Sequence, residues 1–375
     1  MARDKAIDQI LGALVDEQVS DIHFKSGSPP IVRRSGHIIH AQGFPALATE
    51  HLRQIIAEMA SEKQLESLGK GNEVDLAYSL GGKARFRVNI FNQRGTPAVV
   101  MRKIPFSVPD IEDLGLPRTV KDIAMTRRGL VLITGATGSG KSTTLAAMIR
   151  HINEHRRAHI VTVEDPIEFL HADRQSSICQ REVGIDTPGW ANALRSIFRQ
   201  DPDVILIGEI RDADTASMAM RAAQTGHLVL STIHANDSAG AIPRLKDLGT
   251  MDYMISSSLI CVVAQRLVRL LCPWCRTEYA SGSEEERVFG IRPGTRLFGP
   301  VGCPRCTKTG YLGRTMVSET LVVSREIERL ISTGAHPFEI REKAIEEGMA
   351  TLVQDGIRKV VSGRTSFAEV WRVLR

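Results

Sequence analysis

The chain has 375 residues, of which 42% are hydrophobic and 24% are charged, and its formal net charge is +5. These values are typical of a globular protein with two or three domains. The small excess of basic residues permits an anionic partner, such as a nucleic acid or a membrane surface, but does not require one.

Neither a signal peptide nor a transmembrane segment is expected. The first 17 residues contain four acidic side chains and no continuous apolar run, whereas a signal peptide needs such a run. The most apolar later stretch, Ser258 to Leu271, is too short to cross a bilayer, and it is interrupted by Gln265, Arg266 and Arg269. The sequence therefore favours a cytoplasmic location, with any membrane association peripheral.

Residues 1–105 are predicted to form a small α+β domain. Apolar spacing predicts a helix over 6–15 and a second helix over about 50–66. Between and after them, strands are expected at 21–24, 74–78, 84–91 and 98–104. The following segment, 106–118, contains Pro109, Gly115 and Pro117 and is interpreted as a linker that begins after Pro105.

From residue 119 the pattern changes to short apolar strands that alternate with helices. The strands are expected at 130–133, 159–163, 204–207 and 228–231. Because strands buried on both faces are apolar throughout, an α/β domain with a mostly parallel sheet is predicted. From residue 324 the chain is predicted to be helical. Ser324 caps a helix that stops near Gly334, and Ser366 with Glu369 forms a capping box.

A phosphate-binding loop follows the first of these strands. Residues 135–142 fit the pattern G-x-x-x-x-G-K-[ST], and they lie between an apolar strand and a helix that includes residues 143–149. The backbone N–H groups of such a loop surround a phosphate, Lys141 reaches the β- and γ-phosphates, and Ser142 is placed to hold Mg²⁺. The predicted ATP-binding residues of this loop are Gly135, Ala136, Thr137, Gly138, Ser139, Gly140, Lys141, Ser142 and Thr143.

Acidic and imidazole side chains follow the other strands. Glu164 and Asp165 follow the second strand, Glu209 follows the third, and His234 follows the fourth, which begins after His227. Ligands bind at the carboxyl ends of parallel strands. We therefore expect Glu209 to activate the attacking water, Glu164 and Asp165 to orient the water shell of Mg²⁺, and His234 to sense the γ-phosphate. Solvated loop acids, helix caps and structural histidines are the competing interpretations.

Arginines gather in the predicted strands of the first domain, at positions 85, 87, 94 and 102. An arginine can neutralise the charge that develops on a transferred phosphate. The alternative is a solvated basic face of the sheet. Arg195, Arg199 and Arg211 are weaker candidates for the same role.

Four of the six cysteines form two C-x-x-C pairs, Cys272 with Cys275 and Cys303 with Cys306. Two such pairs predict a structural Zn²⁺ site with four thiolates and no open position for catalysis. A redox-active dithiol is the competing interpretation. Cys179 and Cys261 are expected to be buried apolar side chains.

Several of these segments resemble the type II secretion and type IV pilus ATPases (the GspE, PilB and PilT type). Val163 to Phe169 resembles their Asp box, Ala193 to Asp212 their Walker B region, and Thr225 to His234 their His box. In the first domain, Ser20 to His23 and Arg85 to Asn89 carry the same resemblance.

The resemblance implies a hexameric ring of subunits. Each subunit would pair a PAS-like domain (1–105), through a hinge at 106–118, with a RecA-like ATPase domain (119–375) that includes a zinc module (270–310) and a helical part (324–375). It also implies that Arg87 and Arg102 close over the phosphates, that His227 and Asp165 contact the nucleotide, and that hydrolysis drives pilin or pseudopilin movement through an inner-membrane platform protein.

The cysteine insert and residues 346–359 resemble the assembly and secretion branch, whereas the short N-terminus resembles the retraction branch. We favour assembly of a type IV pilus or a type II secretion pseudopilus, with a retraction motor as the first alternative. A nucleic-acid translocase or conjugation-type ATPase is the alternative from a different class.

Overall fold

The structure is a computed structural model that describes residues 5–16, 19–34, 37–81, 83–104 and 107–375. It divides into two compact units, one made of the chain up to Ser107 with Glu168–Leu170, the other of Val108–Ile167 and His171–Arg375. Each unit has its own sheet and its own apolar core.

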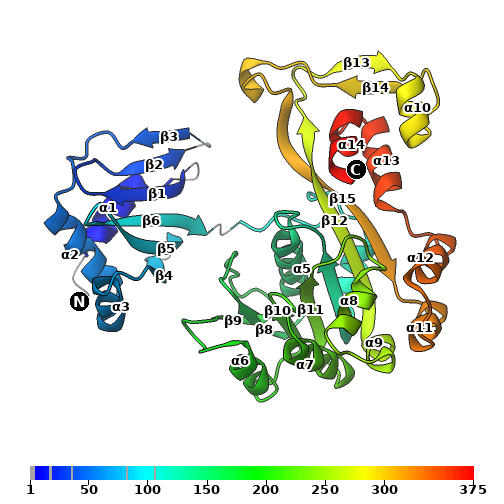
Figure 1. The fold of residues 1–375 in the computed structure, drawn as a ribbon, viewed down its shortest axis with the longest axis horizontal. Helices are drawn as coiled ribbons and strands as arrows, with labels where there is room; N and C mark the ends of the chain where they lie inside the picture. Colours follow the sequence, from blue (N-terminus) through cyan, green and yellow to red (C-terminus); the bar gives the residue numbers. More distant parts are fainter. Residues whose placement is uncertain (1–4, 17–18, 35–36, 82, 105–106) are drawn as a thin grey trace. The chain divides into compact units, whose positions relative to one another are not determined.

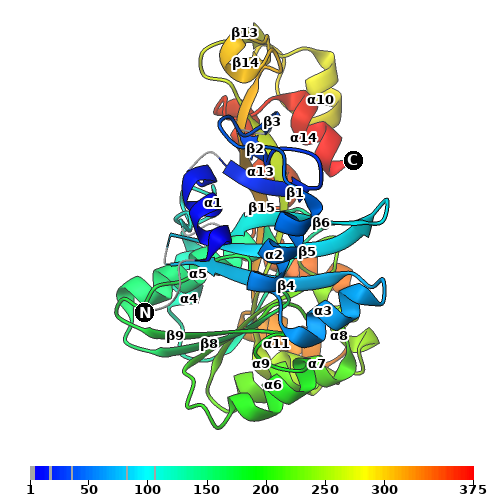
Figure 2. The same ribbon diagram turned by 90° about the vertical axis from the view of Figure 1, so that its left-hand side faces the viewer.

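The first unit contains a six-stranded antiparallel sheet in the order β3-β2-β1-β6-β5-β4. Figure 2 shows the strands in that order from top to bottom. The strands are β1 (Val19–Lys25), β2 (Ile31–Arg34), β3 (His37–His40), β4 (Val74–Leu80), β5 (Ala84–Gln93) and β6 (Thr96–Ile104). Buried side chains alternate with more exposed ones along β4 and β5, as expected for strands with only one face on a core.

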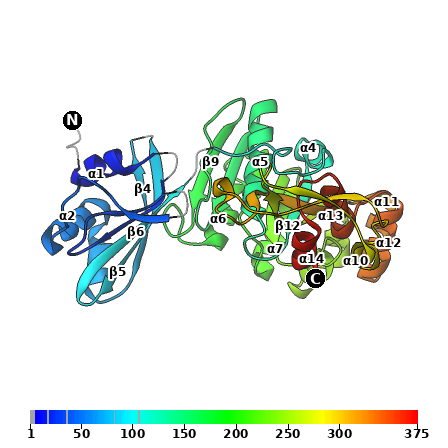
Figure 3. The same cartoon turned by 90° about the horizontal axis from the view of Figure 1, so that it is seen from above.

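Three helices complete this unit: α1 (Ala6–Leu14), α2 (Thr49–Met59) and α3 (Glu62–Gly69). Figure 3 shows α1 and α2 on the same side of the sheet, and apolar side chains from both join one core with the strands. The single helix predicted over 50–66 is wrong. The chain is extended at Ala60 and Ser61, and Gln64 Oε1 accepts from the N–H of Ser61 at 2.9 Å, which starts a new helix.

The second unit contains a seven-stranded sheet in the order β15-β12-β7-β11-β10-β8-β9. All neighbouring strands are parallel except β12 and β15. The strands are β7 (Gly129–Thr134), β8 (His159–Glu164), β9 (Ser177–Glu182), β10 (Val204–Ile207), β11 (Leu228–Ile233), β12 (Leu259–Leu271) and β15 (Tyr311–Val322). The mostly parallel α/β sheet expected from the apolar runs is confirmed, with one antiparallel edge strand that those runs did not indicate.

The α-helices described in this unit are α4 (Thr119–Ala124), α5 (Lys141–His155), α6 (Trp190–Ile197), α7 (Ala213–Gln224), α8 (Ala241–Asp247), α9 (Asp252–Ser258), α10 (Ser283–Phe289), α11 (Arg325–Ser332), α12 (Pro337–Glu346), α13 (Leu352–Val361) and α14 (Phe367–Leu374). The helical C-terminal part is as predicted, and the Ser324 side chain accepts from the N–H of Ile327 at 3.2 Å. No helix among the described residues is long and apolar enough to cross a membrane.

The apolar stretch before Cys272 is the long strand β12, which pairs with β15 and continues beyond the end of β7. Figure 1 shows these two strands leading to β13 (Thr277–Ala280), α10 (Ser283–Phe289) and β14 (Arg296–Gly299). A short 3₁₀ turn, η1 (Pro304–Cys306), precedes β15. We call residues 272–310 the cysteine arm.

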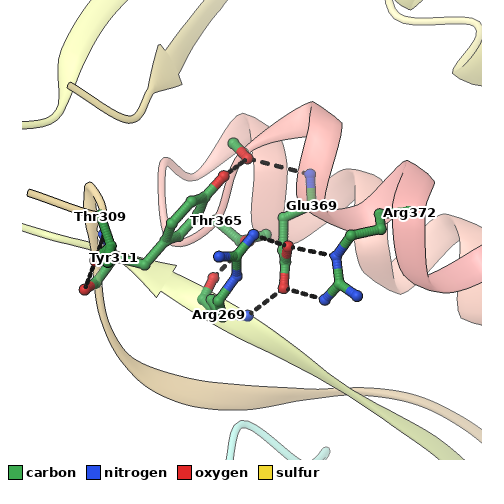
Figure 4. Close-up of polar contacts among 7 residues, drawn as sticks. Arg269, Thr309, Tyr311, Thr365, Glu369 and Arg372 are labelled. Carbon is green, nitrogen blue, oxygen red and sulfur yellow. Dashed lines mark hydrogen bonds and ion pairs between the residues drawn. The ribbon is translucent and has the colours of Figure 1, made fainter. Parts of the chain in front are cut away.

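Helix α14 holds the base of this arm through one buried carboxylate. Glu369 is 1% exposed and accepts from the N–H and the guanidinium of Arg269, at 3.0 and 2.7 Å, and twice from Arg372. Figure 4 shows this cluster, in which Arg269 also stacks on Tyr311. The predicted capping box is therefore half right. Ser366 does cap the helix, but the Glu369 carboxylate is taken by the two arginines.

The segment predicted as a linker packs largely within the second unit. Ile111 and Leu116 are buried, and Leu114 O accepts from the N–H of Met316 at 3.0 Å. Arg150 Nη1 donates to Val108 O at 2.6 Å. The boundary between the units follows Ser107, so residues 108–118 do not form a free linker. Residues 105 and 106 lie outside the described residues.

Candidate functional site

Four loops meet at the carboxyl edge of the parallel strands. The phosphate-loop sequence follows β7, His234 follows β11, Glu209 follows β10, and Glu164 ends β8. These four strands are neighbours in the sheet, and backbone bonds continue past their ends, with Gly208 N–H donating to Val163 O at 2.9 Å. The structure therefore brings these predicted residues to the carboxyl ends of four neighbouring strands, which is where parallel sheets bind their ligands.

The loop at 135–140 has the backbone that a phosphate cradle requires. Gly135 and Gly140 have φ of 147° and 90°, in the region that favours glycine. A Cβ on Gly135 would lie 2.5 Å from Gln265 O, and one on Gly140 would lie 2.8 Å from Met316 Cε. Lys141 Nζ donates to Gly135 O at 2.9 Å and to Ala136 O at 3.2 Å, which places its ammonium over the loop.

The rest of the loop leaves backbone and hydroxyl groups at the surface. Ala136, Thr137 and Gly138 are exposed, whereas Ser142 and Thr143 in the first turn of α5 are half-buried. The Ser139 Oγ is buried, and within the described part of the chain it has no hydrogen-bond partner. Because α5 begins at Lys141, the positive end of its dipole lies at this loop.

The three predicted acids differ in their surroundings. Glu209 is 17% exposed and forms an ion pair with the largely exposed Arg211. Glu164 is half-buried, and Thr162 Oγ1 and Gln180 Nε2 donate to its Oε1 at 2.7 and 3.2 Å. Asp165 is exposed and precedes a cis peptide bond to Pro166. Glu209 and Glu164 are thus oriented by neighbours while staying within reach of solvent.

The loop that carries His234 is tied to the phosphate loop. His234 is exposed, but the next residue, Ala235, exchanges two backbone–hydroxyl hydrogen bonds with Thr134, at 2.9 and 2.7 Å. Further along, Glu319 of β15 accepts from the N–H and the hydroxyl of Ser238 at 3.2 and 2.5 Å. Glu319 is fully buried, and no sequence motif predicted that it would bind this loop.

His227 lies at the amino end of β11, opposite to the end that His234 follows. It precedes β11, and its Nδ1 lies 2.9 Å from Ala222 O and 3.2 Å from Thr225 Oγ1. The strand has six residues, so about 20 Å of β11 separates His227 from His234. Within one subunit, the structure does not bring His227 together with the phosphate loop.

In the first unit, Arg87 and Arg102 lie directly opposite each other on β5 and β6. Both are exposed, and Arg102 Nε donates to the buried Asp21 at 2.9 Å. Burial raises the pKa of Asp21, but the hydrogen bonds from Arg102 and Ser20 outweigh it and hold this pKa below its ordinary value. Asp21, which the sequence offered only as part of a motif, therefore orients Arg102.

The four cysteines of the arm converge on one point, and their sulfurs all lie within 4.8 Å of one another. Three Sγ–Sγ distances are 3.8 or 3.9 Å, and thiolates around a tetrahedral Zn²⁺ lie about 3.8 Å apart. Backbone N–H groups of Gly302, Cys303 and Gly310 point at these sulfurs. Cys261 is buried as expected, but Cys179 is exposed, because it lies on the edge strand β9.

Comparison with known proteins agrees with this geometry. A family described as type II/IV secretion system protein matches residues 3–372. The chain belongs to this family. Type II secretion system protein E of Dickeya dadantii is 36% identical over 387 aligned residues, covering 99% of this chain and 75% of that protein.

The pilus ATPases of the family are also similar to this chain. The type IV pilus retraction ATPase PilT of Pseudomonas aeruginosa is 40% identical over 269 residues, covering 70% of this chain and 78% of that protein. A crystal structure of the pilus retraction motor PilT with bound ADP has a TM-score of 0.79 and 33% identity, and it covers 98% of this chain and 96% of that one. The chain is therefore an ATPase of the secretion and pilus family.

Proposed function

We propose that the chain hydrolyses Mg-ATP as a hexamer and powers assembly of a type IV pilus or a type II secretion pseudopilus. The phosphate loop with Glu164, Glu209 and His234 at one sheet edge is the observation that carries the ATPase part. The alignment with type II secretion system protein E over 99% of this chain supports the secretion part. That relative is longer, since the chain covers 75% of it.

In this proposal the phosphates lie in the glycine loop, where Lys141 exchanges its carbonyl contacts for the β- and γ-phosphates. Mg²⁺ would be held by Ser142, and it would neutralise charge on the phosphates. Glu209 orients and deprotonates the attacking water, Glu164 and Asp165 fix the water shell of the metal, and His234 senses the γ-phosphate. Arg87 and Arg102 neutralise charge in the transition state.

We also infer a structural Zn²⁺ in the cysteine arm, held by Cys272, Cys275, Cys303 and Cys306. The sulfur spacing suits tetrahedral coordination, and four thiolates leave no position for a catalytic water. The ion would hold the two cysteine pairs of the arm rigidly together.

The proposal extends to the domains and partners. The first unit is a PAS-like domain, the second a RecA-like domain, and hydrolysis moves one relative to the other. The ring would work in the cytoplasm against an inner-membrane platform protein and would meet the membrane only through such partners. The similarity to PilT supports pilus retraction as the second candidate.

The test is steady-state ATP hydrolysis by the purified full chain, with its mass followed by light scattering and with DNA or RNA as added variables. Hydrolysis by a hexamer that is indifferent to nucleic acid supports the proposal. Strong stimulation by DNA or RNA would replace it with a translocase. A chain that binds no ATP would contradict both.

A further inference from the structure

A glutamine from a distant part of the chain, Gln265, forms hydrogen bonds with the phosphate loop and with the helix that follows it. Gln265 lies on β12 and its side chain is fully buried. Its Nε2 donates to Ser139 O at 2.9 Å, and its Oε1 accepts from Thr144 Oγ1 at 2.8 Å. One side chain thus binds both the last part of the loop and the first turn of α5.

The chemistry of these partners fixes the orientation of the Gln265 amide. A carbonyl oxygen can only accept a hydrogen bond, so the NH₂ group must face Ser139 O. The amide oxygen then faces the Thr144 hydroxyl, which can donate. With the amide reversed, two oxygens would face each other at Ser139, so only one arrangement is favourable.

The bond to Ser139 O also orients a neighbouring N–H group. In a trans peptide the C=O and the N–H point in opposite directions. The carbonyl of Ser139 is held toward β12, so the N–H of Gly140 in the same peptide group points away from β12. An N–H group that faces away from β12 is placed to donate to a phosphate in the loop.

Two further contacts hold the loop against the same pair of strands. The backbone oxygen of Gln265 occupies the space that a Cβ on Gly135 would need, and Met316 Cε occupies the corresponding space at Gly140. Met316 lies on β15, opposite Leu267 of β12. The loop is therefore supported at its beginning and at its end, and Gln265 provides the polar contact between them.

We propose that Gln265 is a positioning residue for phosphate binding, because its amide holds the Ser139–Gly140 peptide with the N–H of Gly140 turned toward the nucleotide. This inference rests on the proposed ATPase function. The contact is made in the ground state and in the transition state alike, so its loss weakens nucleotide binding and changes the chemical step little.

The test compares Gln265→Met with wild-type full-length protein. Methionine keeps the length of the side chain but cannot donate to Ser139 O, and its sulfur is only a weak acceptor for the hydroxyl of Thr144. We expect KM for Mg-ATP, and the Kd of a fluorescent ATP analogue, to rise about tenfold, which corresponds to one buried hydrogen bond. We expect kcat to change by less than about threefold. Gln265→Asn, which withdraws the amide by one methylene, should act in the same direction.

Thr320→Val is the matched control. Thr320 lies on β15, and its buried Oγ1 has no hydrogen-bond partner among the residues that the structure describes, so replacing this polar side chain by an apolar one breaks no hydrogen bond seen there. It should leave KM and Kd within about twofold of wild type.

The comparison of KM and Kd with kcat distinguishes a positioning role from a general loss of folded protein. A variant that is merely unfolded in part would lower kcat and leave KM unchanged, and that result would overturn the proposal. So would a folded Gln265→Met protein with wild-type KM and Kd. Wild-type protein that binds the analogue without hydrolysing ATP would refute the ATPase function but leave the Kd comparison valid. Wild-type protein that binds no analogue would overturn both.

Discussion

Two glutamates, Glu209 and Glu369, differ in how far their carboxylates are exposed to solvent and in how many hydrogen bonds they accept. Glu209, at the carboxyl edge of the sheet, is 17% exposed and is paired with Arg211, whose side chain is 69% exposed. Glu369, at the base of the cysteine arm, is 1% exposed and accepts four N–H groups from two arginines. The first side chain stays accessible to water, whereas the second is fully occupied.

The contrast indicates that the carboxylate at the carboxyl ends of the strands serves catalysis, whereas the carboxylate at the base of the cysteine arm serves stability. A carboxylate that must orient or deprotonate water needs oxygen atoms that solvent can reach. A carboxylate that joins a strand to a helix is most useful when every acceptor site is satisfied. Removing the charge should therefore affect catalysis at Glu209 and stability at Glu369.

The largest effect is expected for Glu209→Gln. The amide cannot accept a proton from water, so kcat for ATP hydrolysis should fall about 10²- to 10⁴-fold. Because Glu209 is partly exposed, the free energy of unfolding should change by no more than about 0.5 kcal/mol. Turnover assays and urea denaturation measure the two quantities. Unchanged turnover would mean that another group activates the water.

Loss of the inferred zinc comes next. Cys303→Ser removes one of four thiolates, and we expect the bound metal, measured by elemental analysis, to fall from about one ion per chain to near zero. The arm at 272–310 should then be cut faster by proteases. ATP hydrolysis should stay within about twofold, since β12 carries Cys272 about 20 Å beyond Gln265 and the phosphate loop. Cys261→Ala is the control, and its zinc content should match wild type.

At the arm's base, Glu369→Gln should lower the free energy of unfolding by about 2–3 kcal/mol, because charge-assisted hydrogen bonds to Arg269 and Arg372 are lost. Turnover of the folded protein should be within about twofold of wild type. Urea denaturation gives the stability. A loss below about 0.5 kcal/mol would show that the arginines gain as much from water as from Glu369.

The same carboxylate predicts an acid-sensitive part of the stability. Burial raises the pKa of Glu369, but hydrogen bonds from Arg372 and Arg269 outweigh it and lower this pKa from 4.5 to about 2. A depressed pKa stabilises the fold above the unfolded value and loses that contribution as pH falls. Wild-type stability should therefore decline between pH 4.5 and about 2, and Glu369→Gln should lack that portion. Denaturation midpoints across this range test it.

The smallest effect is expected at the break between α2 and α3. Gln64→Ala removes the acceptor for the N–H of Ser61. The expected loss is about 1 kcal/mol from the first unit, with no change in zinc content. Thermal unfolding would show it, and an unchanged midpoint would mean that packing alone ends α2.

The strands that position the site could be predicted because their signal is local. Buried runs such as Leu130–Ile133 and Val204–Ile207 are apolar throughout, and the polar residues after them fall at one edge once the sheet is parallel. Strand β12 could not be assigned in this way. Gln265 and Arg266 interrupt its apolar pattern, and they are buried or half-buried only because the phosphate loop and Asn236 supply their partners from elsewhere in the chain.

Other sequence predictions failed for the same reason, namely a contact with a residue that is distant in the chain. Glu369 has the sequence signature of a capping box, but Arg269, distant in the chain, takes its carboxylate. Segment 108–118 contains the prolines and glycine of a linker, yet Met316 and Arg150 bind its backbone. Local sequence patterns describe turns and caps well, but they carry no information about which distant strand or helix competes for the same groups.

The most direct test of the claim that Glu209 serves catalysis and Glu369 serves stability measures ATP turnover and urea unfolding on the same preparations of Glu209→Gln and Glu369→Gln. We predict that the first variant loses at least about 100-fold in kcat with wild-type stability. We predict that the second loses about 2–3 kcal/mol of stability with turnover close to wild type. If Glu369→Gln abolished turnover while folded, or if Glu209→Gln unfolded the protein while its folded fraction stayed active, this claim would be contradicted.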